Sequence, residues 1–289
     1  MYVLKWPPQW SISSAEFPRR RFDVVISETP LRFLLLFVAC LATPLAHAGD
    51  ALSTDRPDFV ESSDVVGPGR LQIETGFSKE RDSSTGIKSR TRTTPTLIRL
   101  GLTDSLEFRA ESDGRTSVRT TDSFGTSKQT GWSDASLGLK WRMQEGDAEQ
   151  GTAGIAWLAH FDLDSGSSAF RGEVVRPSLR MVVEWDLPYD MSVGVMPGIA
   201  LDRRPNGHRF ASGILAVTLG RAWTPAWRTY VEIAGQQLSS KRNGGSVVTL
   251  DTGLTYLVND AFQLDLSLQR GVTRESPDFA WGVGASIRF

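Results

Sequence analysis

Apolar and polar residues alternate one by one along most of the chain beyond Gly69. In the first such segment, Leu71 and Ile73 fall on one face, and Gln72 and Glu74 fall on the other. A period of two is typical of a β-strand whose faces meet different surroundings. The expected strands lie near residues 69–80, 96–102, 105–113, 134–143, 153–163, 175–186, 191–201, 248–256, 262–269 and 279–289, with two more between 210 and 238.

The connections between these strands alternate in length. Short ones are expected at residues 103–104, 145–150, 188–190, 222–226 and 259–260. Longer, polar ones are expected near residues 81–90, 112–131, 164–172, 202–209, 239–246 and 271–278. Outer-membrane barrels have an even number of strands, short periplasmic turns and longer outer loops. The pattern therefore predicts an all-β fold, a transmembrane antiparallel up-and-down β-barrel of about 12 strands over residues 69–289.

Aromatic residues gather at the two ends of the expected strands. The inner ends carry Trp141, Trp185, Trp223, Trp227, Tyr256, Phe262 and Phe289. The outer ends carry Phe77, Trp132, Phe161, Phe210, Phe279 and Trp281. Amphipathic rings favour the headgroup level of a bilayer, so two girdles are expected of a membrane barrel. A soluble core with scattered aromatic residues explains two bands less well.

Residues 1–48 have the pattern of a leader and signal peptide. Arginines at 19–21 precede the apolar stretch 33–45, which is too short to span a bilayer. Small residues at Ala46 and Ala48 predict cleavage before Gly49. Either translation begins near Leu31 or the first thirty residues form a long leader. The next stretch, 49–68, is expected to be a periplasmic N-terminal segment.

Composition narrows the class of protein. The chain has 289 residues and a formal net charge of −1, which argues against a nucleic-acid partner. It has one cysteine, Cys40, inside the apolar stretch of the expected signal. A lipoprotein signal is the alternative reading of Cys40, but bulky Phe37 stands where leucine is usual. If cleavage follows Ala48, the mature chain has neither a disulfide nor thiolate chemistry.

Two neighbouring motifs resemble a known family. The block from Thr54 to Ser62, TDRPDFVES, is followed by GRLQIETG at residues 69–76. Together they are similar to the opening of an outer-membrane family named for a meta-pathway of phenol degradation, often labelled simply "transporter". The motifs cover about 25 residues, and the barrel pattern extends the likeness over most of the chain. The terminal Phe289 also resembles the final-strand signal that outer-membrane assembly machinery reads.

The resemblance implies an outer-membrane pore or transporter, for hydrophobic or aromatic compounds among others. The residues expected to carry the family motif are Thr54, Asp55, Arg56, Pro57, Asp58 and Ser62. The N-terminal segment has two interpretations. It could enter the barrel as a plug or gate, with Arg56 pairing with carboxylates of the lumen, or it could cap the periplasmic mouth.

Charged residues on the polar faces of the strands are the candidates for a selectivity site. They are Glu74, Glu107, Arg109, Glu111, Lys140, Arg142, Arg176, Arg180, Glu184, Glu232, Asp251 and Asp265. Inward placement is expected because charges facing lipid are costly. They would either select permeants through the field that they set up, or pair with one another and stiffen a filled lumen.

The sequence gives little support to an enzyme. A barrel hydrolase needs a serine, a histidine and a third group that orients the base. After the expected signal, the only histidines are His160, with no serine beside it, and His208 in a loop. Neither zinc spacing nor a glycine-rich phosphate loop is present, and a calcium loop at Asp162 lacks the required glycine. No cofactor and no metal are expected.

The sequence therefore predicts an outer-membrane channel or transporter that passes small solutes by passive or gated diffusion. Its expected partners are outer-membrane lipid, the assembly machinery and a small-molecule permeant that the sequence does not identify. Two alternatives stay open. One is a non-conducting barrel with a surface-binding or structural role, and the other is a barrel hydrolase. The lumen of twelve strands is wide enough to be either a narrow pore or a filled core.

Overall fold

The computed structural model describes residues 52–84, 86–204 and 206–289. The expected leader, signal peptide and Cys40 lie outside the described residues. In the described ranges, no helix is both long and apolar enough to cross a membrane.

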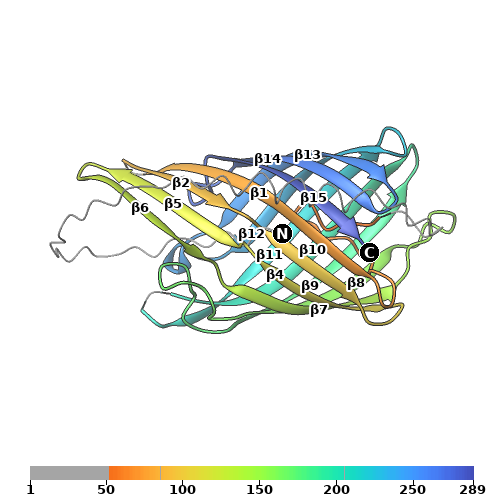
Figure 1. Ribbon diagram of the computed structural model, residues 1–289, viewed down its shortest axis with the longest axis horizontal. Coiled ribbons are helices and arrows are strands. Elements are labelled where there is room, and N and C mark those ends of the chain that lie inside the picture. The colour runs from red at the N-terminus through yellow and green to blue at the C-terminus, as the bar shows by residue number, and fades with distance from the viewer. Residues whose placement is uncertain (1–51, 85, 205) are drawn as a thin grey trace, which may run out of the picture. The chain divides into compact units, whose positions relative to one another are not determined.

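Twelve antiparallel strands form a closed barrel, as the alternation of residues predicts (Figure 1). In chain order they are β1 (Leu71–Ser84), β3 (Thr96–Gly101), β4 (Leu106–Ser112), β7 (Ala135–Gln144), β8 (Gly154–Asp162), β9 (Arg176–Leu187), β10 (Met191–Arg203), β11 (Arg209–Ala222), β12 (Trp227–Leu238), β13 (Val247–Asn259), β14 (Phe262–Gly271) and β15 (Phe279–Arg288). Each strand pairs with its neighbours in this list, and β15 closes the barrel on β1. The fold class is confirmed.

Three further strands extend the sheet beyond the barrel. They are β2 (Ile87–Thr93), β5 (Arg115–Asp122) and β6 (Gly125–Trp132), and they continue β3, β4 and β7 outward. The long polar connections expected at 81–90 and 112–131 are therefore mostly regular strands. These strands carry serine, threonine and charged residues on both faces, so the apolar alternation that marks a strand inside a membrane is missing.

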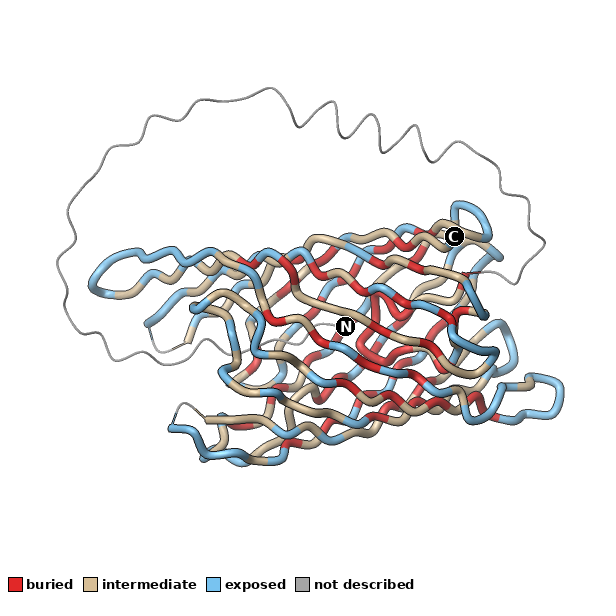
Figure 2. The backbone as a smooth tube through the Cα atoms, turned by 60° about the horizontal axis from the view of Figure 1, so that its bottom comes forward, coloured by how far each residue is buried: buried red, intermediate tan, exposed pale blue. Residues whose placement is uncertain are grey.

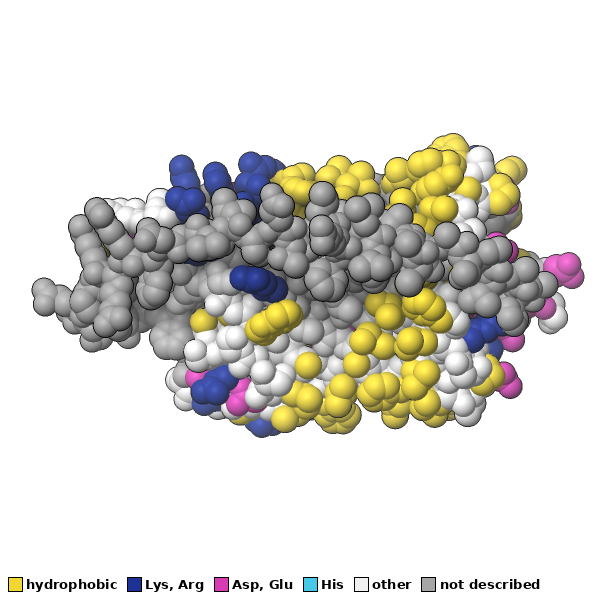
Figure 3. Space-filling view, in the orientation of Figure 1, with side chains coloured by type: hydrophobic (Ala, Val, Ile, Leu, Met, Phe, Trp, Pro, Cys, Tyr) yellow, Lys and Arg dark blue, Asp and Glu magenta, His cyan; other side chains and the backbone are white. Residues whose placement is uncertain are grey.

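The two faces of the barrel wall differ as an outer-membrane protein requires. Figure 2 shows buried positions alternating with exposed ones along the strands. Leu100, Leu139 and Leu266 are among the apolar side chains that face outward and stay exposed. The exposed apolar side chains of the strands together form an apolar band, and Figure 3 shows hydrophobic side chains gathered on one face of the barrel. Closure satisfies the backbone within lipid, and this band faces the hydrocarbon, so the barrel lies in the outer membrane of a Gram-negative bacterium.

The N-terminal segment (residues 52–70) lies inside the lumen. Asp55 and Glu61 are fully buried there, and Phe59 and Val60 are almost fully buried. At the mouth nearest the C-terminus the segment turns, and Gly69 donates its N–H to the carbonyl of Gly101 (2.9 Å) before β1 begins. Gly69 adopts φ +73°, a conformation that glycine takes without strain.

Candidate functional site in the barrel lumen

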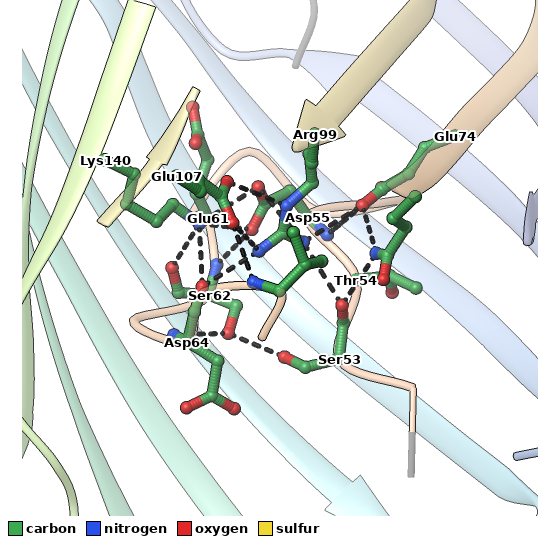
Figure 4. Close-up of polar contacts among 12 residues, drawn as sticks. Ser53, Thr54, Asp55, Glu61, Ser62, Asp64, Glu74, Arg99, Glu107 and Lys140 are labelled. Atoms are coloured by element: carbon green, nitrogen blue, oxygen red, sulfur yellow. Dashed lines mark hydrogen bonds and ion pairs between the residues drawn. The ribbon is translucent and has the colours of Figure 1, made fainter. Parts of the chain in front are cut away.

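Asp55 is the centre of a buried ionic network (Figure 4). Its carboxylate accepts hydrogen bonds from Lys140 Nζ (2.9 and 3.0 Å) and Arg109 Nη1 (2.5 Å), and it lies 3.5 Å from Arg99 Nη1. It also accepts the backbone N–H of Ser62 (2.8 Å), which closes the motif block on itself. Burial raises the pKa of Asp55, but Arg99, Lys140 and Arg109 outweigh it and hold the pKa well below its usual range.

Glu61 is the second carboxylate that the segment brings to the wall. Its two oxygens bind Arg109 Nη2 (2.7 Å) and Arg180 Nη1 (2.9 Å). Arg109 also binds Glu107 (2.8 Å), so one guanidinium joins two residues of the segment to the barrel. Such a bridge neutralises the carboxylates and also fixes the position of the segment, because a guanidinium presents its N–H donors in a rigid, planar arrangement.

The wall completes the network. Arg99 binds Glu107 (2.9 Å) and Glu74 (3.1 Å). Those two carboxylates also accept backbone N–H groups of the segment, from Val66 (2.9 Å) and from Asp55 (3.1 and 3.2 Å). Four cations thus face four carboxylates. The cations are Arg99, Arg109, Lys140 and Arg180, and the carboxylates are Asp55, Glu61, Glu74 and Glu107. Withdrawing the segment would remove two of these four carboxylates, Asp55 and Glu61, from the network.

Arg56 forms a separate pair with the wall. Its Nε and Nη2 donate to the carboxylate of Asp265 (3.1 and 2.9 Å). The guanidinium lies over Gly76 and Gly284, which are register partners on β1 and β15. A Cβ atom on either glycine would collide with it. The glycine of the second motif therefore makes room for the arginine of the first.

The opposite side of the segment meets an apolar surface. Phe59 and Val60 pack against inward-facing residues of β8 to β12, which we call the apolar sector. The apolar sector consists of Leu158, Val182, Met196, Ile214, Ala216 and Ala234. Glu232 fixes the backbone there, since its carboxylate accepts the N–H groups of Phe59 (2.8 Å) and Val60 (2.7 Å). We call Glu74, Arg99, Glu107, Arg109, Lys140 and Asp265, on β14, β1, β3, β4 and β7, the charged sector.

The predicted lumen residues fall into three groups. Those that touch the segment are Glu74, Glu107, Arg109, Lys140, Arg180, Glu184, Glu232 and Asp265. Glu111 and Asp251 face the lumen elsewhere. Glu111 lies 4.0 Å from His160, and Asp251 accepts from Thr249 (2.9 Å). Arg142 and Arg176 lie near the two ends of the barrel, and Arg142 Nη1 also lies 3.7 Å from the carboxylate of Asp64 in the segment. Arg142 donates to the carbonyl of Asp104, and Arg176 binds Asp134 and Asp162 (3.2 Å each).

The remaining motif residues are also placed by polar contacts or burial. Thr54 accepts a hydrogen bond from Gln263 (2.8 Å) and donates to the carbonyl of Arg56 (2.8 Å). Asp58 lies 4.0 Å from Arg228, and Pro57 is buried. Phe289 exchanges backbone hydrogen bonds with Leu71, and its side chain is exposed. Its role as an assembly signal stays a prediction.

His160 is buried next to the ionic network. Arg109 Nε donates to His160 Nε2 (3.2 Å), so this nitrogen serves as an acceptor. The imidazole also packs on Gly138, where a Cβ atom would collide with it. These contacts explain a buried histidine in structural terms.

Sequence reasoning missed two kinds of residue. Arg99 lay on the polar face of its expected strand, but it was not chosen as a candidate. The apolar sector was missed because alternation assigns apolar residues to the lipid face. Consecutive apolar residues such as Trp157-Leu158 and Met181-Val182-Val183 were the available signal, because a strand that is apolar on both faces reads as a continuous run.

A cavity of about 30 Å³ lies beside the segment on the charged side, lined by Arg56, Glu74, Leu97, Glu111 and others. It has room for about two water molecules, so an aromatic solute does not fit in it.

Comparison with known proteins gives the family. The profile described as "Putative MetA-pathway of phenol degradation" matches residues 54–289. The chain belongs to this family. The match covers both the lumen segment from Thr54 onward and the whole barrel. No curated protein sequence matches the chain.

Several solved barrels are similar in outline. The β-domain of the Bordetella autotransporter Brka has a TM-score of 0.49 at 14% identity, covering 77% of this chain and all of that one. The toluene transporter TbuX of Ralstonia pickettii has a TM-score of 0.40 at 10% identity, covering 77% and 89%. The monoaromatic hydrocarbon channel CymD has a TM-score of 0.39 at 9% identity, covering 77% and 88%.

Proposed function

We propose that this protein is an outer-membrane transporter for small hydrophobic solutes, aromatic compounds among them. The lumen segment closes the passage at rest and shifts when a solute passes. The observation that carries the proposal is the apolar sector, a buried apolar surface on five neighbouring strands inside a membrane barrel. The family description, which refers to phenol degradation, supports the same class of solute.

An apolar surface inside the lumen suits such a solute for a simple reason. Polar inward residues are usual in barrels of this class, because they line a water-filled interior. A hydrophobic solute gains roughly 25 cal/mol for each Å² of apolar area that leaves water, so an apolar lining lowers its free energy inside. Phe59 and Val60 now occupy this surface. A solute would take their place as the segment moves.

The charged sector supplies the resting position of the segment. Its ion pairs are buried, so breaking one without a substitute partner is costly. These ion pairs also require one defined position of the segment, because Arg109 must contact Asp55, Glu61 and Glu107 at the same time. The segment would therefore move as a unit, with water or another donor replacing the lost contacts.

The test compares uptake of two solutes by intact Gram-negative cells that carry the protein in the outer membrane. We expect faster uptake of a radiolabelled small aromatic hydrocarbon and no change for a sugar of similar mass. Equal gains for both solutes, or no gain from protein shown to be folded, would contradict the proposal. Folding is checked by the slower electrophoretic migration of the boiled sample.

A pair of near-isosteric variants ties the effect to the apolar sector. Val182→Thr adds a hydroxyl group to the lumen surface, and Val183→Thr adds one to the other face of the same strand. Burying an unpaired hydroxyl costs about 1–3 kcal/mol, so the lumen variant should slow aromatic uptake several-fold. The Val183→Thr variant should leave uptake unchanged.

The tight packing of the segment also favours a second candidate, a barrel that does not conduct. Single-channel recording from the chain that begins at Gly49 separates the two readings when it is combined with uptake. A transporter that is gated by the segment should show rare ionic openings that become frequent in an Arg109→Ala variant. A non-conducting barrel should show neither openings nor aromatic uptake.

A further inference from the structure

Eight cations share the outward face of the extension that β2, β5, β6 and the end of β1 build beyond the barrel. Lys79 and Arg81 follow Phe77 on the outward face of β1, and strand register assigns the others to the same face. We call this surface the cationic face. Its residues are Lys79, Arg81, Lys88, Arg90, Arg92, Arg115, Arg119 and Lys128.

Four of these cations stand in one row across the sheet. Arg81 is the register partner of Arg90, Arg90 of Arg119, and Arg119 of Lys128. Directly opposed like charges destabilise a sheet. A row of four cations therefore raises the free energy of the folded protein unless anions cover it.

Within the described residues, no carboxylate neutralises this face. None of its eight side chains forms an ion pair with a described aspartate or glutamate. The acidic residues of the extension, Glu80, Asp82 and Asp122, alternate onto the other face. Seven of the eight cations are exposed, and Lys79 is half-buried. The cations of the extension therefore lie on one face and its carboxylates on the other, so the positive charge of the cationic face is not neutralised.

Protection of a sheet edge does not explain the row. Charged residues, lysine above all, are common on edge strands, where they prevent pairing with another chain. Lys128 lies on β6, whose far side has no partner strand. Arg90 and Arg119 lie on β2 and β5, which are paired on both sides.

The cationic face begins where the apolar band ends. Lys79 and Arg81 lie two and four residues beyond Phe77, which is about 7 and 13 Å along the strand. The first distance falls within the headgroup region above the hydrocarbon, and the tilt of the strand keeps the second close to that region. Arg81 also lies 5.5 Å from the ring centroid of Phe279. Figure 3 shows lysine and arginine side chains gathered beside the apolar band, in the part of the view where Figure 1 draws β2.

This end of the barrel is the outer one. The extension lies opposite the mouth that holds Leu71 and Phe289, and the longer connections 163–175, 239–246 and 272–278 share its side. Long connections are extracellular in barrels of this class. The cationic face is therefore level with the outer leaflet, which in a Gram-negative cell consists of phosphorylated glycolipid.

We propose that the cationic face binds the phosphate groups of this outer-leaflet glycolipid. Arginine binds phosphate through paired N–H donors, and the row presents three arginines and a lysine in register. The acyl chains of the same lipid lie against the neighbouring apolar band. A lipid thus meets both surfaces at once, whereas a soluble polyanion meets only the cations. The proposal is independent of whether the barrel transports anything.

The test uses matched triple variants of the folded full barrel in mixed micelles. The first is Arg90→Gln, Arg119→Gln and Lys128→Gln, which removes three charges from the row. The second is Arg171→Gln, Arg242→Gln and Arg274→Gln, which removes three exposed cations from outer loops. Binding of bisphosphorylated lipid A is titrated for each by native mass spectrometry. We expect the row variant to bind at least roughly tenfold more weakly, because each cation near an anionic lipid surface contributes to affinity. The loop variant should match the parent protein.

Three outcomes would overturn the proposal. One is equal weakening in the two triple variants. Another is equal affinity of the parent protein for lipid A and for its dephosphorylated form. The third is equal affinity for a phosphorylated core oligosaccharide without acyl chains, which would identify a soluble polyanion instead. Both variants should fold, since each removes exposed charge, and slower migration of the boiled sample checks this.

Discussion

The two sides of the lumen hold the same segment by different physics. The charged sector holds Asp55, Arg56 and Glu61 through ion pairs of defined geometry. The apolar sector holds Phe59 and Val60 by packing alone, apart from the two hydrogen bonds to Glu232. Ion pairs are selective for one partner and one position, whereas apolar packing tolerates exchange of one occupant for another.

This difference indicates that the two sectors have different roles. Buried ion pairs add little net stability compared with apolar residues, but removing one partner is strongly destabilising. The charged sector therefore acts as a latch that is either intact or broken. The apolar sector is a surface that another hydrophobic group could cover. If this contrast is correct, substitutions on the two sides should have different consequences.

The largest expected effect is from Arg109→Ala. The variant leaves Asp55, Glu61 and Glu107 buried without their shared cation. We expect the free energy of unfolding to fall by about 3–5 kcal/mol. Urea unfolding from lipid vesicles measures it, and maleimide labelling of a Ser63→Cys reporter should become faster. Arg176→Ala is the control, because that side chain pairs with Asp134 and Asp162 of the barrel rather than with the segment. If the two substitutions lowered the free energy of unfolding and accelerated labelling equally, the charged sector would not act as a latch.

Leu158→Ala tests the apolar sector. The side chain is fully buried, so its truncation should cost about 2–4 kcal/mol. The reporter at Ser63 should stay protected, because every ion pair of the segment remains. Leu266→Ala on the lipid face should cost less, since acyl chains fill the space. Release of the segment in Leu158→Ala would show that the two sides act together rather than separately.

A smaller effect is expected from Gly284→Ala. The added methyl group displaces the guanidinium of Arg56 from its bidentate pair with Asp265. Losing hydrogen bonds to a charged group costs about 1–3 kcal/mol. Gly213→Ala is the matched control, since its Cβ atom would meet Leu238 at an ordinary 3.4 Å. The midpoints of urea unfolding are compared for the two variants. Equal midpoints would contradict the proposal that Gly76 and Gly284 make room for Arg56.

The smallest effect is expected from mild acid. The pKa of Asp55 is lowered, so its contribution to stability is complete above about pH 4 and lost only as the pH falls through the lowered value. Burial raises the pKa of Asp58, with Arg228 opposing, so Asp58 adds stability as the pH falls. Labelling of the Ser63→Cys reporter is divided at each pH by labelling of an exposed Ser123→Cys reporter, because the thiolate is the reactive form and becomes scarcer in acid. This ratio should be no higher at about pH 5 than at about pH 8, and a higher ratio at the lower pH would contradict the role of the latch.

Much of the fold could be predicted from sequence, because barrel strands alternate between lipid and lumen. For example, the apolar Leu139 faces the lipid and the charged Lys140 faces the lumen, as their side-chain types predict. The strands β2, β5 and β6 could not be recognised, because above the membrane both faces are polar. Local pattern shows a strand only where its two faces meet different solvents.

The site was less accessible to sequence reasoning. One of the two interpretations of the segment paired Arg56 with a carboxylate of the lumen, but the sequence did not identify its partner Asp265, which lies 209 residues away. Only closure of β15 on β1 brings β14 close to the segment. Leu158 and Met196 look like lipid-facing residues by type, and only their burial identifies the apolar sector.

The proposed transport requires the segment to leave the apolar sector when a solute passes. A reversible disulfide tether tests this requirement. Val60 Cγ1 lies 2.9 Å from the position of a Cβ atom on Gly194, so Val60→Cys with Gly194→Cys should form a disulfide. From Gly49 onward the chain has no other cysteine. We predict that oxidation stops aromatic uptake by cells carrying the double variant, that reduction restores it, and that neither single variant responds. Undiminished uptake with the disulfide fully formed would contradict the account.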